Sequence, residues 1–214
     1  MLISHEHRCQ IVRALFGRIS TSLAAAWPTW LTLKILRESN SIIMNAAELL
    51  TITRVIRSVP HCRLLIFGVG YDSHYWVACN RGGTTCFVEH DTSWSEQIAG
   101  EIGREKIVIA NYAYRCSEWQ RLLTTPNNLL MELPPEITAV TWDVILVDGP
   151  PGWLPEQPGR MQSIYTAACL SPRHGYVFVH DCDREAEQVY CDRFLSPEIL
   201  QRQVGTLRQY RKLS

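Results

Sequence analysis

Residues 63–91, RLLIFGVGYDSHYWVACNRGGTTCFVEHD, decide the fold of this chain. Residues 64–67 form an apolar run too short for a separate helix, and Gly68 bounds it, which is typical of a buried parallel strand. Gly68 and Gly70 let the backbone turn sharply and let a ligand approach the main chain. The pattern therefore predicts a strand followed by a ligand-binding turn.

A helix and a second strand are predicted after this turn. Asp72 and Ser73 can cap a helix over residues 73–79, whose free N–H groups would face the ligand. Residues 84–88 form the second strand and deliver Glu89, 19 residues after the second glycine. Folds that bind dinucleotides or nucleosides use an acidic residue at this offset to bind the ribose diol. The stretch is thus predicted to be a βαβ nucleoside site.

The glycine pattern also indicates which cofactor is bound. Ser73 stands where the dinucleotide fingerprint has its third glycine. With an acidic end to the second strand, this favours S-adenosylmethionine, which has no pyrophosphate to bind, over NAD. A glycine-rich turn of an ordinary α/β protein is the alternative interpretation. The predicted cofactor-binding residues are Gly68, Gly70, Asp72, Ser73, Glu89, His90, Asp91 and Asp148.

Composition excludes several classes of function. The 214 residues fit one α/β domain, with residues 1–44 as a helical extension and residues 45–214 as the core. The 21 basic residues balance the 21 acidic ones, which argues against nucleic acid as a partner. The 8 cysteines form no CxxC pair, so most of them are expected to be buried thiols rather than zinc ligands. Arginines interrupt the early apolar runs, and a cytoplasmic protein without a membrane span is expected.

The remaining segments complete an α/β pattern. Further strands are predicted at residues 106–110, 142–148 and 176–179, and residues 199–210 are expected to form an antiparallel pair around a glycine. Helices are predicted over residues 11–23, 30–36 and 46–60, 94–101, 116–123 and 184–194. The predicted helix caps are Asn45 with Glu48, Ser93 with Glu96, and Asp183. The first two helices would cover the sheet or pair in a homodimer.

Polar residues follow four of the predicted strands and sum to a site. Besides the glycines, Glu89 and Asp91, they are Asp148 after the fourth strand and His180, Asp181 and Asp183 after the fifth. The carboxyl edge of an open parallel sheet is where such folds bind ligands. Tyr112, after the third strand, could border an adenine or be an ordinary loop aromatic.

Five segments resemble a known family. FGVGYDSHYW, CFVEHD, WDVILVDGPPGW, PGRMQSIYTA and FVHDCDRE, in this order, are similar to the glucuronoxylan 4-O-methyltransferase-like family of polysaccharide biosynthesis proteins. The resemblance covers residues 45–210. It implies a class I S-adenosylmethionine-dependent methyltransferase fold, a Rossmann-like three-layer sandwich whose seven-stranded sheet is parallel except for its last strand. The plant members carry an N-terminal membrane anchor that this sequence is expected to lack, so its acceptor could be another glycan or a small acidic metabolite.

The leading functional hypothesis is an O-methyltransferase acting on a hydroxyl of an acidic sugar such as glucuronic acid. The predicted catalytic residues are Asp148, His180 and Asp181, as general bases or, for Asp148 and Asp181, as ligands of a divalent cation. Metal-dependent catechol-type enzymes resemble this arrangement, although Cys182 replaces their asparagine ligand. A non-catalytic scaffold and a nicotinamide-dependent oxidoreductase are the alternatives.

The substrate-binding residues are predicted to be Arg160, Asp183 and Arg184. Both arginines would lie at the rim of the site, where two guanidinium groups could bind the carboxylate of a uronic acid. The alternative is that each arginine only neutralises neighbouring aspartates, for instance Arg184 with Asp181.

Overall fold

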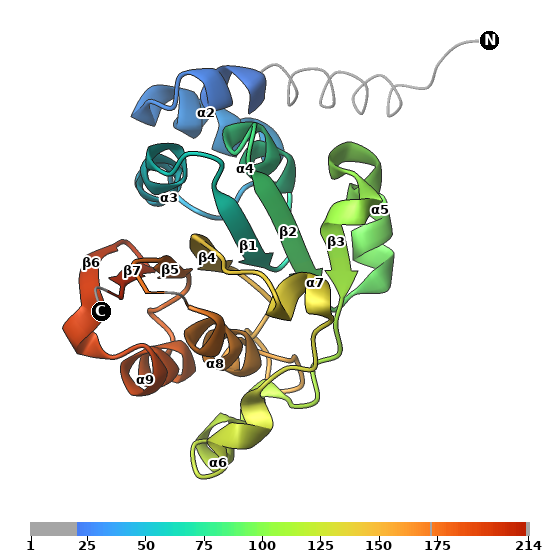
Figure 1. Ribbon diagram of the computed structural model, residues 1–214, viewed down its shortest axis with the longest axis vertical. Helices are drawn as coiled ribbons and strands as arrows, with labels where there is room; N and C mark the ends of the chain where they lie inside the picture. Colours follow the sequence, from blue (N-terminus) through green and yellow to red (C-terminus); the bar gives the residue numbers. More distant parts are fainter. Residues whose placement is uncertain (1–20, 172, 213–214) are drawn as a thin grey trace.

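A computed structural model describes residues 21–171 and 173–212. They form a seven-stranded sheet in the order β3-β2-β1-β4-β5-β7-β6, with helices on both faces (Figure 1). The first five strands are parallel, and β7 runs antiparallel to both β5 and β6. The predicted fold, the class I methyltransferase sandwich with an antiparallel last strand, is confirmed.

The strands lie where the apolar runs place them. Their bounds are β1 Arg63–Phe67, β2 Thr84–Glu89, β3 Ile107–Ile109, β4 Val144–Val147, β5 Tyr176–Val179, β6 Leu200–Val204 and β7 Leu207–Arg211. Alternate residues of β1 enter different cores: Leu64 and Ile66 on one face of the sheet, Leu65 and Phe67 on the other. Both faces of β1 are therefore buried, as expected of a central parallel strand.

Helices cover each face of the sheet. The first core contains side chains from α2 Trp30–Asn40, α3 Ala46–Ser58, α4 Ser73–Cys79 and α5 Thr92–Ile102. The second contains side chains from α6 Trp119–Leu122, α7 Pro135–Thr138, α8 Met161–Leu170 and α9 Glu185–Phe194. Short 3₁₀ turns lie at η1 Arg104–Lys106, η2 Cys116–Glu118, η3 Pro126–Leu129 and η4 Pro197–Ile199. The sheet is thus the middle of three layers (Figure 1).

The predicted caps have mixed outcomes. Asn45 caps α3, and Glu48 returns a hydrogen bond to the Asn45 N–H, so this capping box is confirmed. The box predicted at Ser93 is wrong, because α5 begins at Thr92 and the Asp91 carboxylate accepts the cap hydrogen bond from the Trp94 N–H.

The N-terminal region is only partly described. Most of the helix predicted over residues 11–23 lies outside the described residues. The next helix, α2, packs on α3 through the fully buried Leu33 and Leu36. Over residues 21–171 and 173–212, no helix is both long enough and apolar enough to span a bilayer.

Candidate active site

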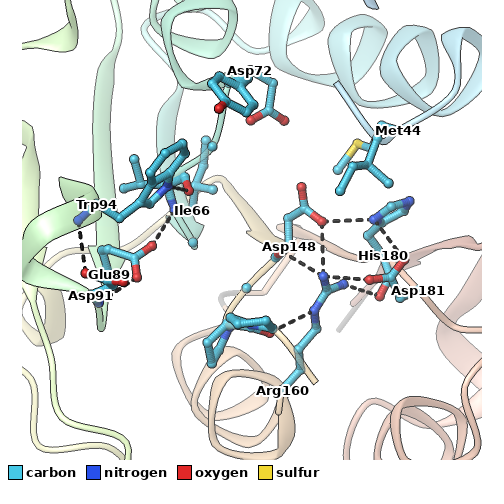
Figure 2. A pocket seen from close by; sticks show the side chains of 18 of the residues that line it. Met44, Ile66, Asp72, Glu89, Asp91, Trp94, Asp148, Arg160, His180 and Asp181 are labelled. Carbon is cyan, nitrogen blue, oxygen red and sulfur yellow. Dashed lines mark hydrogen bonds and ion pairs between the residues drawn. The ribbon is translucent and has the colours of Figure 1, made fainter. Parts of the chain in front are cut away.

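A cavity of about 380 Å³ opens at the carboxyl ends of the parallel strands. The loops after β1, β2, β4 and β5 line it, together with residues 41–44, which lead into α3. Figure 2 shows two groups of labelled polar side chains, one around Glu89 and Asp91 and the other around Asp148, His180 and Asp181, with Asp72 apart from both in this view. The volume is in the range of small-molecule sites.

Two glycines form a close backbone contact at the middle of the cavity. Gly68, which follows β1, has a φ of +106°, and a Cβ there would lie 2.9 Å from the backbone of Gly149, which follows β4. A Cβ on Gly149 would lie 2.6 Å from the Gly68 Cα. The two strand-end loops therefore touch backbone to backbone, which only glycine permits. The glycine turn predicted as a ligand site is also a packing contact between β1 and β4.

Glu89 lies at the first end of the cavity and is 4% exposed. Its Oε2 accepts a hydrogen bond from the Val69 N–H at 2.8 Å, and its Oε1 accepts from the N–H groups of His90 and Asp91. Burial would raise the pKa of the Glu89 carboxyl, but hydrogen bonds from His90, Asp91 and Val69 lower it below its usual range. A carboxylate is thus fixed at the tip of β2 in its ionised form.

Trp94 shares this end of the cavity and was not among the predicted site residues. Its Nε1 donates to the Val69 carbonyl at 2.7 Å, and Tyr71 packs edge-on against its ring at 5.2 Å. The sequence shows Trp94 only as part of a helix start. The turn of α5 that Asp91 caps is what directs the indole into the cavity.

Asp72 also lines the cavity but does not cap α4 through its side chain, so that prediction is wrong. Its Oδ2 instead accepts from the Trp76 indole N–H at 2.8 Å. Burial and the nearby charge of Asp148 raise the pKa of Asp72 to about 7, although the Trp76 hydrogen bond acts in the opposite direction. Ser73 accepts a hydrogen bond from the Gly70 N–H at 2.9 Å and so stabilises the glycine turn.

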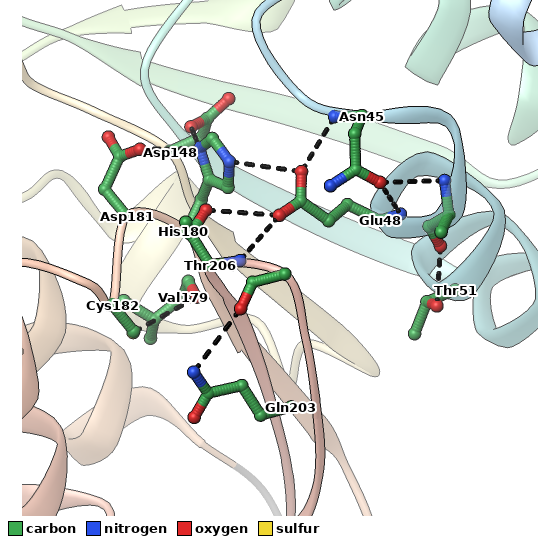
Figure 3. Close-up of polar contacts among 12 residues, drawn as sticks. Asn45, Glu48, Thr51, Asp148, Val179, His180, Asp181, Cys182, Gln203 and Thr206 are labelled. Atoms are coloured by element: carbon green, nitrogen blue, oxygen red, sulfur yellow. Dashed lines mark hydrogen bonds and ion pairs between the residues drawn. The ribbon is translucent and has the colours of Figure 1, made fainter.

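The second end of the cavity centres on His180, whose ring lies between two carboxylates (Figure 3). His180 Nδ1 lies 2.9 Å from Asp148 Oδ1, and His180 Nε2 lies 3.5 Å from Glu48 Oε2. Glu48 also accepts hydrogen bonds from the N–H and hydroxyl groups of Thr206 in the turn between β6 and β7. The capping glutamate of α3 thus joins the helix to β5 and to the C-terminal hairpin.

These contacts fix the charges of both groups. Burial would lower the pKa of His180, but Asp148 and Glu48 raise it to about 10. Burial would raise the pKa of Glu48, but hydrogen bonds from His180, Asn45 and Thr206 lower it to about 2. His180 is therefore an imidazolium cation at neutral pH with a carboxylate at each nitrogen. This argues against the general-base role expected of it.

Arg160 is not at the rim, so its predicted placement is wrong. The residue lines the cavity but is only 3% exposed. Its guanidinium donates to the carbonyl oxygens of His180 at 2.7 Å and Asp148 at 2.8 Å, and its Nη2 lies 2.7 Å from Asp181 Oδ2. A buried guanidinium is stable only when its N–H groups are paired, and here protein oxygens take them. Arg160 therefore holds the loops after β4 and β5 together.

The contacts of Arg184 agree with the alternative interpretation, in which this arginine neutralises Asp181. Its Nη2 donates to Asp181 Oδ2 at 2.6 Å, its Nη1 lies 3.5 Å from Glu187 Oε1, and its guanidinium lies 3.9 Å from the centre of the Trp153 ring. Asp183 is exposed and is not among the residues that line the cavity. It does not cap α9 either, because the helix begins at Glu185 with Arg184 at the cap position and no side-chain hydrogen bond.

The donor set at the second end does not fit the predicted divalent cation. Asp148, His180 and Asp181 do place one ligand atom each within 4.8 Å of one another. However, Arg160 and Arg184 both lie against Asp181 Oδ2, and His180 is itself a cation. Three positive groups already neutralise the two aspartates, so a metal ion would have to displace a guanidinium.

Tyr112, which could have bordered an adenine, is not among the residues that line the cavity. Its hydroxyl forms a hydrogen bond with Ser163 at 2.7 Å, and the centre of its ring lies 6.0 Å from that of His90. Glu48 was predicted only as a cap, and no sequence signal shows its second role. Trp153 lines the cavity and was visible only as the end of the resembling segment WDVILVDGPPGW.

Sequence comparisons with known proteins identify the family of this chain. The family model described as IRX15/IRX15L/GXM matches residues 47–129 and 125–210. Arabinogalactan O-methyltransferase 2 of Arabidopsis thaliana is 32% identical over 195 residues, which are 79% of this chain and 67% of the relative. Glucuronoxylan 4-O-methyltransferase 1 of the same plant is 30% identical over 207 residues, covering 86% and 73%. Protein IRX15-LIKE, also from Arabidopsis thaliana, is 36% identical over 200 residues, covering 81% and 63%. The chain belongs to the IRX15/IRX15L/GXM family.

Proposed function

We propose that the chain is an S-adenosylmethionine-dependent O-methyltransferase whose acceptor is a hydroxyl group of an acidic sugar carried on a glycan. The observation that carries this proposal is the single cavity that joins Glu89, at the end of β2, to Asp148, at the end of β4. The first residue suits a nucleoside, and the second suits the proton of an acceptor. Relatives named as O-methyltransferases of two polysaccharides support the reaction and the substrate class.

The first end of the cavity fits the cofactor. Glu89 is ionised, and its Oε2 accepts only the Val69 N–H within the described chain, so this oxygen keeps a lone pair for a ribose hydroxyl. Asp91 and Trp94 would border the nucleoside, and the turn at Gly68 and Gly70 would lie against the methionine part. When bound, S-adenosylmethionine supplies a methyl group on a positively charged sulfur.

Asp148 is the residue we assign to the acceptor hydroxyl. Its Oδ1 is fixed by His180 and Arg160, whereas its Oδ2 has no hydrogen-bond partner in residues 21–171 and 173–212. Asp181 is less suitable, because both of its oxygens lie against cations. Methyl transfer from sulfur to oxygen is an in-line displacement, so the protein aligns the groups and accepts the hydroxyl proton. Asp148 Oδ2 is the oxygen placed to accept it.

Transfer of a labelled methyl group from S-adenosylmethionine tests the proposal. We expect glucuronoxylan to be methylated and the same xylan with its carboxyl groups reduced to alcohols to be a poor acceptor. Asp148→Asn should lower kcat by about a hundredfold, the usual contribution of a positioned base. Asp183→Asn is the matched control, because Asp183 is exposed and outside the cavity, and should leave the rate unchanged. Equal labelling of the native and reduced xylan would refute the acidic acceptor.

A non-catalytic scaffold is the second candidate. The relative Protein IRX15-LIKE, whose name states no activity, is 36% identical to this chain, above the 32% and 30% of the two named methyltransferases. If this candidate is correct, no methyl transfer will be detected to any glycan although the protein is folded.

A further inference from the structure

Trp153 is an exposed tryptophan at the edge of the cavity. Its side chain is on the loop that follows Asp148, it lines the same cavity, and it is 56% exposed. Leu154 beside it is also 51% exposed, but it is not among the residues that line the cavity. Aromatic side chains that line a cavity are common components of ligand-binding sites.

The loop that carries Trp153 is ordered by its own hydrogen bonds. Gln157 Oε1 accepts from the N–H groups of Trp153 at 2.8 Å and Leu154 at 3.0 Å. The Gly159 N–H donates to the Pro151 carbonyl at 2.9 Å and closes the loop. Two further bonds, Cys116 N–H to the Gln157 carbonyl and Ser117 N–H to the Pro155 carbonyl, fix the loop to η2. The exposed indole is therefore carried by a loop that hydrogen bonds hold in one conformation.

Arg184 covers one face of the indole. Its guanidinium carbon lies 3.9 Å from the ring centre, and the guanidinium is itself held by Asp181 at 2.6 Å. Such a cation–π contact is attractive, so it restricts the orientation of the ring. With one face covered and more than half of the residue exposed, Trp153 presents a flat surface beside the acceptor end of the cavity.

We propose that Trp153 is a stacking platform for a sugar unit next to the methyl-accepting sugar on the same glycan, so that the site recognises an oligosaccharide. This rests on the proposed function. The electron-rich face of an indole suits the C–H face of a pyranose ring, and a rigid aromatic side chain loses little entropy on binding.

The position of Trp153 sets the unit that it contacts. Asp148, where the acceptor hydroxyl must lie, is at the end of β4, and Trp153 lies five residues further along the chain, at the exposed edge. The cofactor end, at Glu89, belongs to β2, on the far side of β1 from β4. The Trp153 ring contacts Arg184, which follows β5, and β5 lies next to β4 on the side away from β1 and β2. The platform therefore belongs to the acceptor end of the cavity and not to the cofactor end.

Calorimetry with two probes tests this subsite. The probes are xylotetraose that carries one glucuronic acid side chain and the methyl glycoside of glucuronic acid, each added to protein saturated with S-adenosylhomocysteine. Trp153→Ala should raise the Kd of the oligosaccharide roughly tenfold, as for truncation of an interface tryptophan, and leave that of the monosaccharide unchanged. Trp153→Phe should restore most of the affinity. Leu154→Ala, the matched control on the same loop, should change neither value.

Each other outcome overturns the platform. In calorimetry, these outcomes are an unchanged oligosaccharide Kd in Trp153→Ala, an equal loss of affinity for both probes, or no oligosaccharide binding by the unaltered protein. In size-exclusion chromatography, the outcome is a dimer of the unaltered protein that Trp153→Ala does not form, which would make Trp153 part of an interface between copies. The proposed function is judged separately by methyl transfer. Transfer without dependence of binding on Trp153 refutes the platform alone, whereas Trp153-dependent binding without transfer refutes the enzyme alone.

Discussion

His180 and its three carboxylate neighbours show how the second end of the site is charged. Glu48 faces Nε2, Asp148 Oδ1 lies 2.9 Å from Nδ1, and Asp181 Oδ1 lies 3.4 Å from the same nitrogen. A buried cation among these anions is held in one orientation, which in turn fixes the oxygen of Asp148 that faces it. The expected role of His180 is therefore to position Asp148.

The raised pKa of His180 predicts a pH dependence of stability. Its pKa rises from about 6.5 to about 10 on folding, so the stabilisation is complete below pH 6.5 and is lost as the pH rises towards 10. The free energy of unfolding should fall over this window by on the order of a few kcal/mol. Urea unfolding at several pH values, for the unaltered protein and for His180→Gln, measures this loss.

The difference between the two pH slopes removes the contribution of groups that do not interact with His180. Asp72, whose pKa of about 7 depends partly on the charge of His180, adds to the difference only at the lower end of the window. Buried thiols such as Cys62, whose pKa is raised to about 12 by burial, affect both proteins equally. Parallel slopes would show that His180 is not protonated in the folded protein at neutral pH.

Among the structural elements, the carboxyl ends of β1 and β4 depend on each other. A Cβ on Gly149 would lie 2.6 Å from the Gly68 Cα and 3.3 Å from the Phe67 carbonyl oxygen, and backbone atoms cannot rotate away as a side chain can. One of the two loops would have to move. Because both loops line the cavity, such a movement would reach the ligand as well.

Gly149→Ala should therefore destabilise the protein by about 1–3 kcal/mol, the usual cost of overpacking. Gly100→Ala is the matched control. Gly100 lies within α5 and a Cβ there meets nothing within 4 Å, so alanine should be neutral or stabilising by up to about 1 kcal/mol. Both values come from urea unfolding. Equal stabilities of the two variants would contradict the backbone contact.

Local sequence signals predicted the elements better than their ends. The apolar runs predicted β1 and β4, and Asn45 with Glu48 predicted the start of α3. The cap of α5 was assigned to Ser93 instead of Asp91, because both are good caps and the sequence does not show which residue leaves the strand. Asp72 was assigned to a cap because it directly precedes the predicted helix. Its actual pairing with the buried Trp76 indole depends on packing, which the local sequence does not show.

At the scale of the whole molecule, the sheet order brings distant residues into one site. Strand-end reasoning placed Glu89, Asp148 and His180 at one edge, as the structure confirms. It could not place Glu48, which reaches His180 from the helix before β1, or show that Arg160 is buried. These depend on three-dimensional contacts between elements far apart in sequence. The burial of Arg160 and the ion pairs that both arginines form with Asp181 favour neutralisation of aspartates over binding of a substrate carboxylate.

Calorimetry with S-adenosylhomocysteine and with NAD tests most directly whether the cavity holds the methyl donor. We expect one molecule of S-adenosylhomocysteine to bind and NAD not to bind. Glu89→Ala should weaken binding by well over tenfold, since a charge-assisted contact to a ribose is worth about 2–3 kcal/mol. Glu96→Ala, an exposed glutamate on α5, is the control and should bind as the unaltered protein does. Binding of NAD in place of S-adenosylhomocysteine, or unchanged affinity in folded Glu89→Ala, would contradict the assignment.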